Sequence, residues 1–139
     1  MKLTRASSYA LHAVAYMASQ KSEKPVASHN IAQARNIPER FLLKVLKPLV
    51  SARVLLSIKG PNGGYRLARQ PSDITMLEVL EAVDGPIRGQ VPFSEENKSP
   101  LNAKLENICN TSADQVCKHL KKVKISDLVS EKKAAPAPG

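Results

Sequence analysis

Lysine and arginine side chains gather in the first half of this 139-residue sequence. Residues 1–70 hold 12 of them against two acids, Glu23 and Glu39, whereas residues 71–139 hold nine against ten acids. The net charge of +9 therefore arises entirely in the first half. A basic module of this kind is suited to a polyanion, and we expect nucleic acid ahead of an acidic membrane surface. The alternative is a solvated basic face that serves only solubility.

Two cysteines and one histidine are the other candidates for chemistry. Cys109 and Cys117 make neither a disulfide framework nor a four-cysteine zinc module. Eight residues along one helix separate Cα atoms by about 12 Å, and a disulfide needs about 4.4–6.8 Å, so we expect two small, buried thiols. His12 has Ser8 near it but no oriented acid, and the phosphate-loop, HExxH and CxxC motifs are missing. We therefore expect no enzyme, the alternative being a small enzyme or metal protein built on these three residues.

The elements that position the basic residues are three short helices and a β-hairpin. Apolar residues recur at three- and four-residue steps over 3–19, 29–35 and about 38–52. We expect Thr4 or Ser7 to cap the first helix and Ser28 to cap the second. Two β-type runs, 54–58 and 65–68, flank a turn that contains Asn62-Gly63. This order is typical of a winged helix-turn-helix, whose third helix enters the major groove of DNA.

The second half predicts a helix at 76–83 capped by Ser72 or Thr75, a loop at 85–100 and a longer helix from about 101 to 123. The long helix carries an apolar stripe that a small domain leaves uncovered, so we expect it to form a homodimer interface. Packing back on the first helix is the alternative. The expected interface residues are Leu105, Ile108, Val116, Leu120 and Val123.

The predicted fold class is therefore mainly α with a β-hairpin wing. We expect a DNA-binding domain at 1–84, the loop at 85–100, a dimerisation helix within 101–130 and a disordered Ala/Pro tail at 131–139. No apolar run is long enough for a transmembrane helix, and the first 20 residues do not have the pattern of a signal peptide. We expect a cytoplasmic protein with no membrane partner.

Several segments resemble one family of bacterial regulators. The opening Lys2-Leu3-Thr4, the segment Ile31-Ala32 and the run Ala82-Val83-Asp84-Gly85-Pro86 are similar to those of the Rrf2 family of winged-helix transcriptional regulators. The most specific match is the wing sequence SIKGPNGGYRL at 57–67, and the resemblance extends over about residues 1–130. It implies a homodimer that binds a pseudo-palindromic operator, with dimerisation through the long C-terminal helix and the first helix.

The same resemblance bears on cofactors. Cluster-sensing members of the family carry three cysteines in the loop before the dimer helix, but residues 85–104 of this chain contain none, and Ala103 stands at about the place of the last one. The cysteine-free members are the closer comparison, so we expect no metal or cofactor. The alternative is a redox or iron–sulfur sensor that uses Cys109 and Cys117 with His12 of the partner subunit.

The residues expected to touch DNA lie on the third helix, on the second helix and in the wing. Arg40 or Lys44 could donate to guanine, and Glu39 could accept from cytosine. Phosphate contacts are expected from the start of the second helix and from the start of the first helix, and the wing tip is similar to the family's minor-groove element. These residues are Ser28, His29, Lys59, Gly60, Pro61, Lys2 and Arg5. We expect a homodimeric, sequence-specific regulator of double-stranded DNA, acting as a repressor; the alternative is a winged-helix module that binds nucleic acid with little sequence preference.

Overall fold

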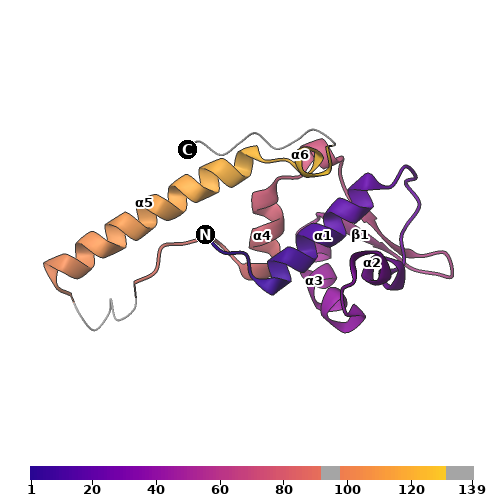
Figure 1. Cartoon of the computed structure of the whole chain (residues 1–139), viewed down its shortest axis with the longest axis horizontal. Helices are drawn as coiled ribbons and strands as arrows, with labels where there is room; N and C mark the ends of the chain where they lie inside the picture. The colour runs from indigo at the N-terminus through magenta and orange to yellow at the C-terminus, as the bar shows by residue number, and fades with distance from the viewer. Residues whose placement is uncertain (92–97, 131–139) are drawn as a thin grey trace.

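Three helices and a β-hairpin form the first half of the chain in the computed structural model, which describes residues 1–91 and 98–130. The helices are α1 (Arg5–Ser19), α2 (Ser28–Arg35) and α3 (Glu39–Ser51). The hairpin pairs β1 (Leu55–Ile58) with β2 (Gly64–Leu67) in antiparallel register, Leu55 opposite Leu67. Figure 1 shows α2, α3 and the hairpin together on one side of α1. The predicted winged helix-turn-helix is confirmed.

Small and branched apolar side chains fill the interior. α1 lies centrally and contacts α2, α3, α4 and α6. Its residues Ala10, Ala13 and Val14 are fully buried, because small side chains let the neighbouring helices approach closely. The core continues through α3 and the hairpin with Leu42, Leu46, Leu49, Val54 and Leu55. The face of α3 that carries no core residue is thereby left to solvent.

The observed cap of α1 agrees with the prediction, whereas the observed cap of α2 differs from it. Thr4 caps α1 and accepts a hydrogen bond from the Ser7 backbone N–H, as predicted. Asn36 ends α2 in the left-handed conformation, with φ 53° and ψ 47°. The prediction that Ser28 caps α2 is wrong: Ala27 is the N-cap, and Ser28 is the first helical residue. Its hydroxyl bonds instead to Glu39 of α3, which draws Ser28 into the helix.

The wing, residues 55–67, is fixed to the connection between α1 and α2. Val26 and Tyr65 exchange two backbone hydrogen bonds of 2.8 Å, so Val26 acts as a one-residue third strand. Gly64 lies beside this bridge with φ of 150°, and a Cβ there would stand 2.4 Å from the Val26 carbonyl oxygen. Only glycine fits, and this close approach holds the hairpin against the domain.

The helix after the wing, α4 (Met76–Asp84), begins with a capping box. Thr75 accepts from the Glu78 N–H, and the Glu78 carboxylate accepts from the Thr75 N–H at 2.8 Å. Thr75 is therefore the cap, and Ser72 lies instead in a single 3₁₀ turn, η1 (Pro71–Asp73). At the other end of α4, the Asp84 carboxylate accepts hydrogen bonds from the hydroxyls of Thr4 and Ser7, which ties α4 to the start of α1.

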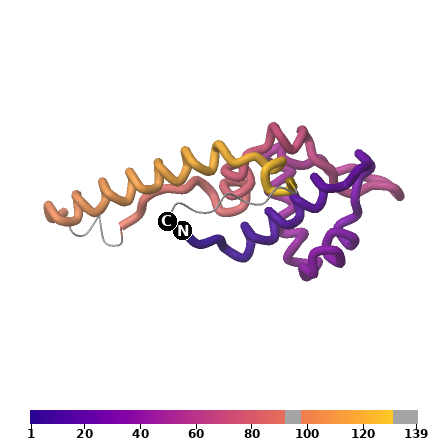
Figure 2. The backbone as a smooth tube through the Cα atoms, turned by 45° about the horizontal axis from the view of Figure 1, so that its top comes forward, coloured from indigo at the N-terminus to yellow at the C-terminus, as the bar shows by residue number. Residues whose placement is uncertain are grey.

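The long helix is α5 (Pro100–Lys122), within one residue of the predicted bounds at each end. Met76 donates to the Val123 carbonyl, and Ile125 opens a separate short helix, α6 (Ile125–Val129), with its side chain in the core. The segment within 101–130 is thus two helices, and the second returns to the domain. Figures 1 and 2 show α5 projecting away from the rest of the molecule, with the segment that follows α4 alongside it.

The predicted disordered tail, 131–139, lies outside the described residues, as does part of the predicted loop, 92–97. Among residues 1–91 and 98–130, no helix has both the length and the apolar character needed to cross a membrane.

Candidate nucleic-acid interface

The solvent face of α3 carries most of the residues predicted to touch DNA. Leu42, Val45, Leu46 and Leu49 are buried, which fixes the rotation of the helix about its axis. The exposed side chains fall into two rows with four-residue steps. One row holds Glu39, Leu43 and Lys47, and the neighbouring row holds Arg40 and Lys44; all five are exposed.

Phe41 orients the two cations of the second row. The Arg40 guanidinium lies 4.7 Å from the centre of the Phe41 ring, and the Lys44 ammonium lies 5.7 Å from it. Such cation–π contacts restrict the two long side chains while leaving their charges in solvent. The arrangement presents two preorganised cations on one helix, as base or phosphate recognition requires.

Glu39 joins α3 to α2. Its carboxylate accepts a hydrogen bond of 3.1 Å from the Ser28 hydroxyl and lies 3.5 Å from His29 Nδ1. Ser28 and His29 open α2, whose first N–H groups form the predicted phosphate site. The structure therefore brings three of the predicted residues together, and the acid among them faces its neighbours on α2.

The remaining predicted DNA contacts are more scattered. Lys59, Gly60 and Pro61 are all exposed at the turn of the wing, where Gly60 adopts φ of 110°. Arg5 is exposed at the first position of α1. Lys2, by contrast, lines a cavity of about 300 Å³ with residues of α4, α5 and the segment after α4, among them Leu80, Ile87 and Val116. Lys2 thus stands apart from α3 and the wing.

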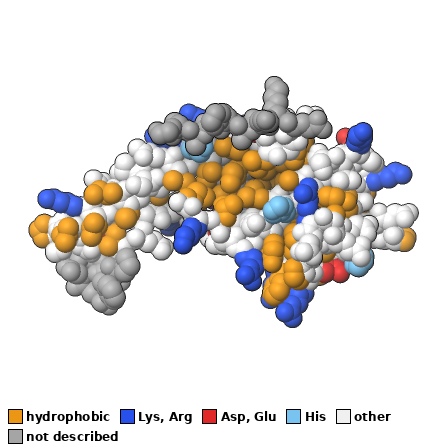
Figure 3. All heavy atoms as spheres, in the orientation of Figure 1, with side chains coloured by type: hydrophobic (Ala, Val, Ile, Leu, Met, Phe, Trp, Pro, Cys, Tyr) orange, Lys and Arg blue, Asp and Glu red, His pale blue; other side chains and the backbone are white. Residues whose placement is uncertain are grey.

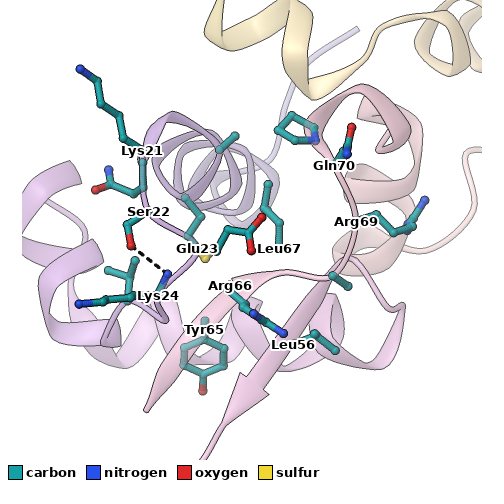
Figure 4. A pocket seen from close by; sticks show the side chains of 16 residues that line it. Lys21, Ser22, Glu23, Lys24, Leu56, Tyr65, Arg66, Leu67, Arg69 and Gln70 are labelled. Carbon is teal, nitrogen blue, oxygen red and sulfur yellow. Dashed lines mark hydrogen bonds between the residues drawn. The ribbon is translucent and has the colours of Figure 1, made fainter. Parts of the chain in front are cut away.

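A larger open pocket of about 500 Å³ lies between β2 and the connection that follows α1. Figure 4 shows Lys21, Lys24 and Arg66 around it, with Tyr65 and Leu67 contributing the wall from β2. Arg69, also on its rim, bonds the Glu78 carboxylate at 2.5 Å. None of the predicted DNA-contacting residues lines this pocket.

The ion pair between Arg69 and Glu78 changes the pKa of the Glu78 carboxyl group. Partial burial raises the pKa of Glu78, but hydrogen bonds from Arg69 and from Thr75, together with the guanidinium charge, outweigh burial and lower that pKa below its ordinary value. Because Glu78 also closes the capping box of α4, this ion pair stabilises the fold beside the wing and is separate from the DNA face.

The two thiols do not assemble a metal site within the described part of the chain. Cys109 and Cys117 are free and lie on the uninterrupted helix α5. Both are half-buried, so the expectation of fully buried thiols is wrong; the Cys117 thiol faces the Ile87 carbonyl at 3.8 Å. His12 is exposed on α1, and no group of three or more His, Cys, Asp or Glu side chains there could hold a metal ion. The residues do not fit an iron–sulfur cluster in one subunit.

The predicted stripe on α5 is divided between two environments. Leu105 and Ile108 are exposed, and Leu101 extends their strip toward the start of the helix. Leu120, however, is only 5% exposed, and Val116 and Val123 are half-buried, because the end of α5 packs on the chain itself. Figure 3 shows hydrophobic side chains gathered at the far end of α5. The uncovered apolar surface thus belongs to the first turns of the helix.

Two features of the candidate interface were missed in the sequence. Leu43 is a large apolar residue on the exposed face of α3, and Phe41 is the platform for Arg40 and Lys44. The signal for Leu43 is present in the sequence: it lies four residues from both Glu39 and Lys47, on the polar side of the helical pattern.

Comparison with known proteins gives a consistent picture. A family model described as "Rrf2: Iron-dependent Transcriptional regulator" matches residues 3–131. A relative from Mycobacterium tuberculosis, named as an HTH-type transcriptional regulator, is 33% identical over 101 residues, which are 68% of this chain and 63% of the relative. The chain thus matches under two thirds of that protein's length.

Solved structures extend the comparison to nearly the whole chain. The structure of CymR, titled the global cysteine regulator of B. subtilis, aligns with a TM-score of 0.77 and 28% identity over 96% of this chain and 99% of that one. An IscR structure from T. potens aligns with a TM-score of 0.72 and 21% identity, covering 99% and 94% of the two chains. At that identity the second likeness shows the fold.

Proposed function

Since the chain belongs to the Rrf2 family of transcriptional regulators, a family of regulators and not of enzymes, we propose that it binds double-stranded DNA as a sequence-specific repressor. The proposed unit is a homodimer on a pseudo-palindromic operator. Residues 1–84 form the DNA-binding domain in this proposal, and α5 provides the contact between subunits.

The observation that carries the proposal is the exposed face of α3. Arg40 and Lys44 are restrained on Phe41 and free of acidic partners among the described residues, so their charges are available to DNA. Lys59 at the wing and the N-terminus of α2 supply further phosphate contacts on the same domain. Base edges supply the sequence preference, and phosphates supply most of the affinity.

The first turns of α5 support the dimer. Leu101, Leu105 and Ile108 are 66%, 41% and 60% exposed on a helix that projects from the domain. A contiguous apolar strip of this kind is unfavourable in water unless another surface covers it, and a second copy places two α3 helices on one duplex. Two half-sites about one helical turn apart follow from such symmetry.

We further propose that the protein regulates without the three-cysteine cluster of other family members. The family model's description names iron dependence, but both cysteines of one subunit lie on α5 and His12 lies on α1, and no three such side chains come together among the described residues. A cluster would need ligands from two subunits.

Selection of bound duplexes from a random pool tests the proposed function. The expected result is enrichment of one inverted repeat, with footprints on two half-sites about 10–10.5 base pairs apart. Binding of all duplexes without enrichment would show instead a basic module with little sequence preference. Arg40→Ala/Lys44→Ala is the matched variant, which should lose the enriched sequence, and Lys121→Ala on the exposed side of α5 is the control, which should keep it.

A further inference from the structure

Leu43 is an apolar residue in a charged surface. Its side chain is 43% exposed at the middle of α3, at the edge of the solvent face and beside the buried row of Leu42 and Leu46. Glu39 precedes it by four residues and Lys47 follows it by four, so all three lie in one row. Part of this side chain stays open to solvent in the described part of the chain.

The neighbours of Leu43 are held away from it. Glu39 is engaged with Ser28 and His29 on α2, and Arg40 and Lys44 lie over the ring of Phe41. The exposed part of the leucine side chain therefore lies beside polar side chains that are engaged elsewhere. The cations Arg40, Lys44 and Lys47 beside this patch make it unsuited to an apolar protein surface, but they match a duplex whose phosphates flank the floor of a groove.

The major groove offers one apolar group at its floor, the C5-methyl of thymine. We propose that Leu43 contacts this methyl group and so specifies thymine at one position of each half-site. The inference rests on the proposed function, because it requires α3 to lie in the major groove. Arg40 and Lys44 then read or anchor the neighbouring positions, and Leu43 distinguishes thymine from cytosine by contact alone.

Replacement of thymine by deoxyuridine removes only the methyl group and tests the proposal directly. The selected operator is synthesised with one symmetric pair of thymines at a time replaced by deoxyuridine, and the affinity of the wild type and of Leu43→Ala is measured. Burial of a methyl group corresponds to about fourfold in affinity, so a symmetric pair should weaken the wild type by about 15-fold. At that pair, Leu43→Ala should bind the thymine and deoxyuridine duplexes equally.

Two controls make the outcome specific. Lys47→Ala, in the same row, should weaken binding to all duplexes and keep the deoxyuridine effect. Thermal unfolding of Leu43→Ala should match the wild type, because the side chain is exposed. If every deoxyuridine substitution affects wild type and Leu43→Ala equally, the thymine contact is overturned while the operator still supports the proposed function. If no operator is enriched at all, the proposed function itself fails.

Discussion

The Glu39 carboxylate lies 3.5 Å from His29 Nδ1, and this pair connects the first residue of α3 to the start of α2. Both residues are exposed, and the Ser28 hydroxyl bonds the same carboxylate. An acid on a surface for DNA would repel phosphate if it were free. Glu39 instead contacts Ser28 and His29 of α2, and these contacts help to fix the angle between α2 and α3.

Glu39→Gln should therefore act on the helix pair more than on base preference. We expect a loss of about 0.5–1 kcal/mol in the free energy of unfolding, since the charge-assisted contacts are exposed. Binding to all duplexes should strengthen slightly because a negative charge is removed. Chemical denaturation and a selection experiment measure the two effects. Loss of preference for one C·G pair would show that Glu39 reads cytosine after all.

Arg40 and Lys44 should differ from Lys59 in what their loss changes. Arg40→Ala or Lys44→Ala should cost about 1–3 kcal/mol of binding free energy on the operator and relax the preference at one base pair. Lys59→Ala should weaken operator and unrelated DNA alike and lower the salt slope by about one. Titrations at several salt concentrations separate the cases. Equal weakening of every sequence by all three variants would place Arg40 and Lys44 among the phosphate contacts.

Dimerisation should depend on the exposed part of the α5 stripe. Ile108→Glu puts a charge on a residue that is 60% exposed, so the subunit should fold normally and sediment as a monomer. Asn107→Asp adds the same charge on the neighbouring exposed position and should leave the dimer intact. Leu120→Glu should instead unfold the protein, because Leu120 is buried in its own chain. A monomeric wild type at micromolar concentration in sedimentation would contradict the dimer.

The stability of α4 should fall in acid through Glu78. Its pKa is lowered in the folded protein, so its contribution is present above the pKa of the unfolded chain and is lost as pH falls through the folded value. Glu78→Gln should therefore destabilise the protein near pH 7, by about 1 kcal/mol as other capping changes do, and converge with the wild type in acid, where Glu78 is protonated. Urea denaturation over this pH range gives the comparison. A difference that does not shrink in acid would assign the effect to packing.

Metal content tests the cofactor proposal. Protein purified without oxygen should hold no stoichiometric iron or sulfide, because one subunit offers two cysteines about 12 Å apart along a helix and no third ligand near them among the described residues. Stoichiometric iron and sulfide that disappear in Cys109→Ala would show a cluster shared between subunits.

The helices and wing could be predicted from the sequence because local signals agree there. The periodicity of α3, the left-handed Asn36 and the glycine-rich turn between two β-type runs all point to the same fold, although the left-handed positions of the wing are Gly60 and Gly64 and not Asn62-Gly63. The cap of α2 was wrong because a tertiary contact, from Ser28 to Glu39, outweighs the local preference. The bounds of α5 were predicted to within one residue, but the short helix α6, which returns Ile125 to the core, was not distinguished within the segment 101–130.

The candidate site was harder to predict from the sequence than the fold, again because it depends on contacts between elements. The helical periodicity places the cations on the solvent face of α3. It does not show that Phe41 restrains two of them or that the Leu43 side chain is exposed. Likewise, the stripe on α5 is continuous in sequence, and only packing divides it into a covered end at Leu120 and an open end at Leu101. The hydrophobic pattern of a single sequence does not determine the contacts between its helices and strands.

The ratio of affinities for the selected operator and for a scrambled duplex of equal composition, measured at physiological salt, tests the central proposal most directly. Sequence-specific regulators bind their sites about 10³–10⁷ times more tightly than other DNA. We predict a ratio of at least about 10³ for the wild type, which falls toward one in Arg40→Ala/Lys44→Ala. A wild-type ratio below about ten would contradict a sequence-specific regulator and identify the protein as a basic winged-helix module that binds DNA by charge alone.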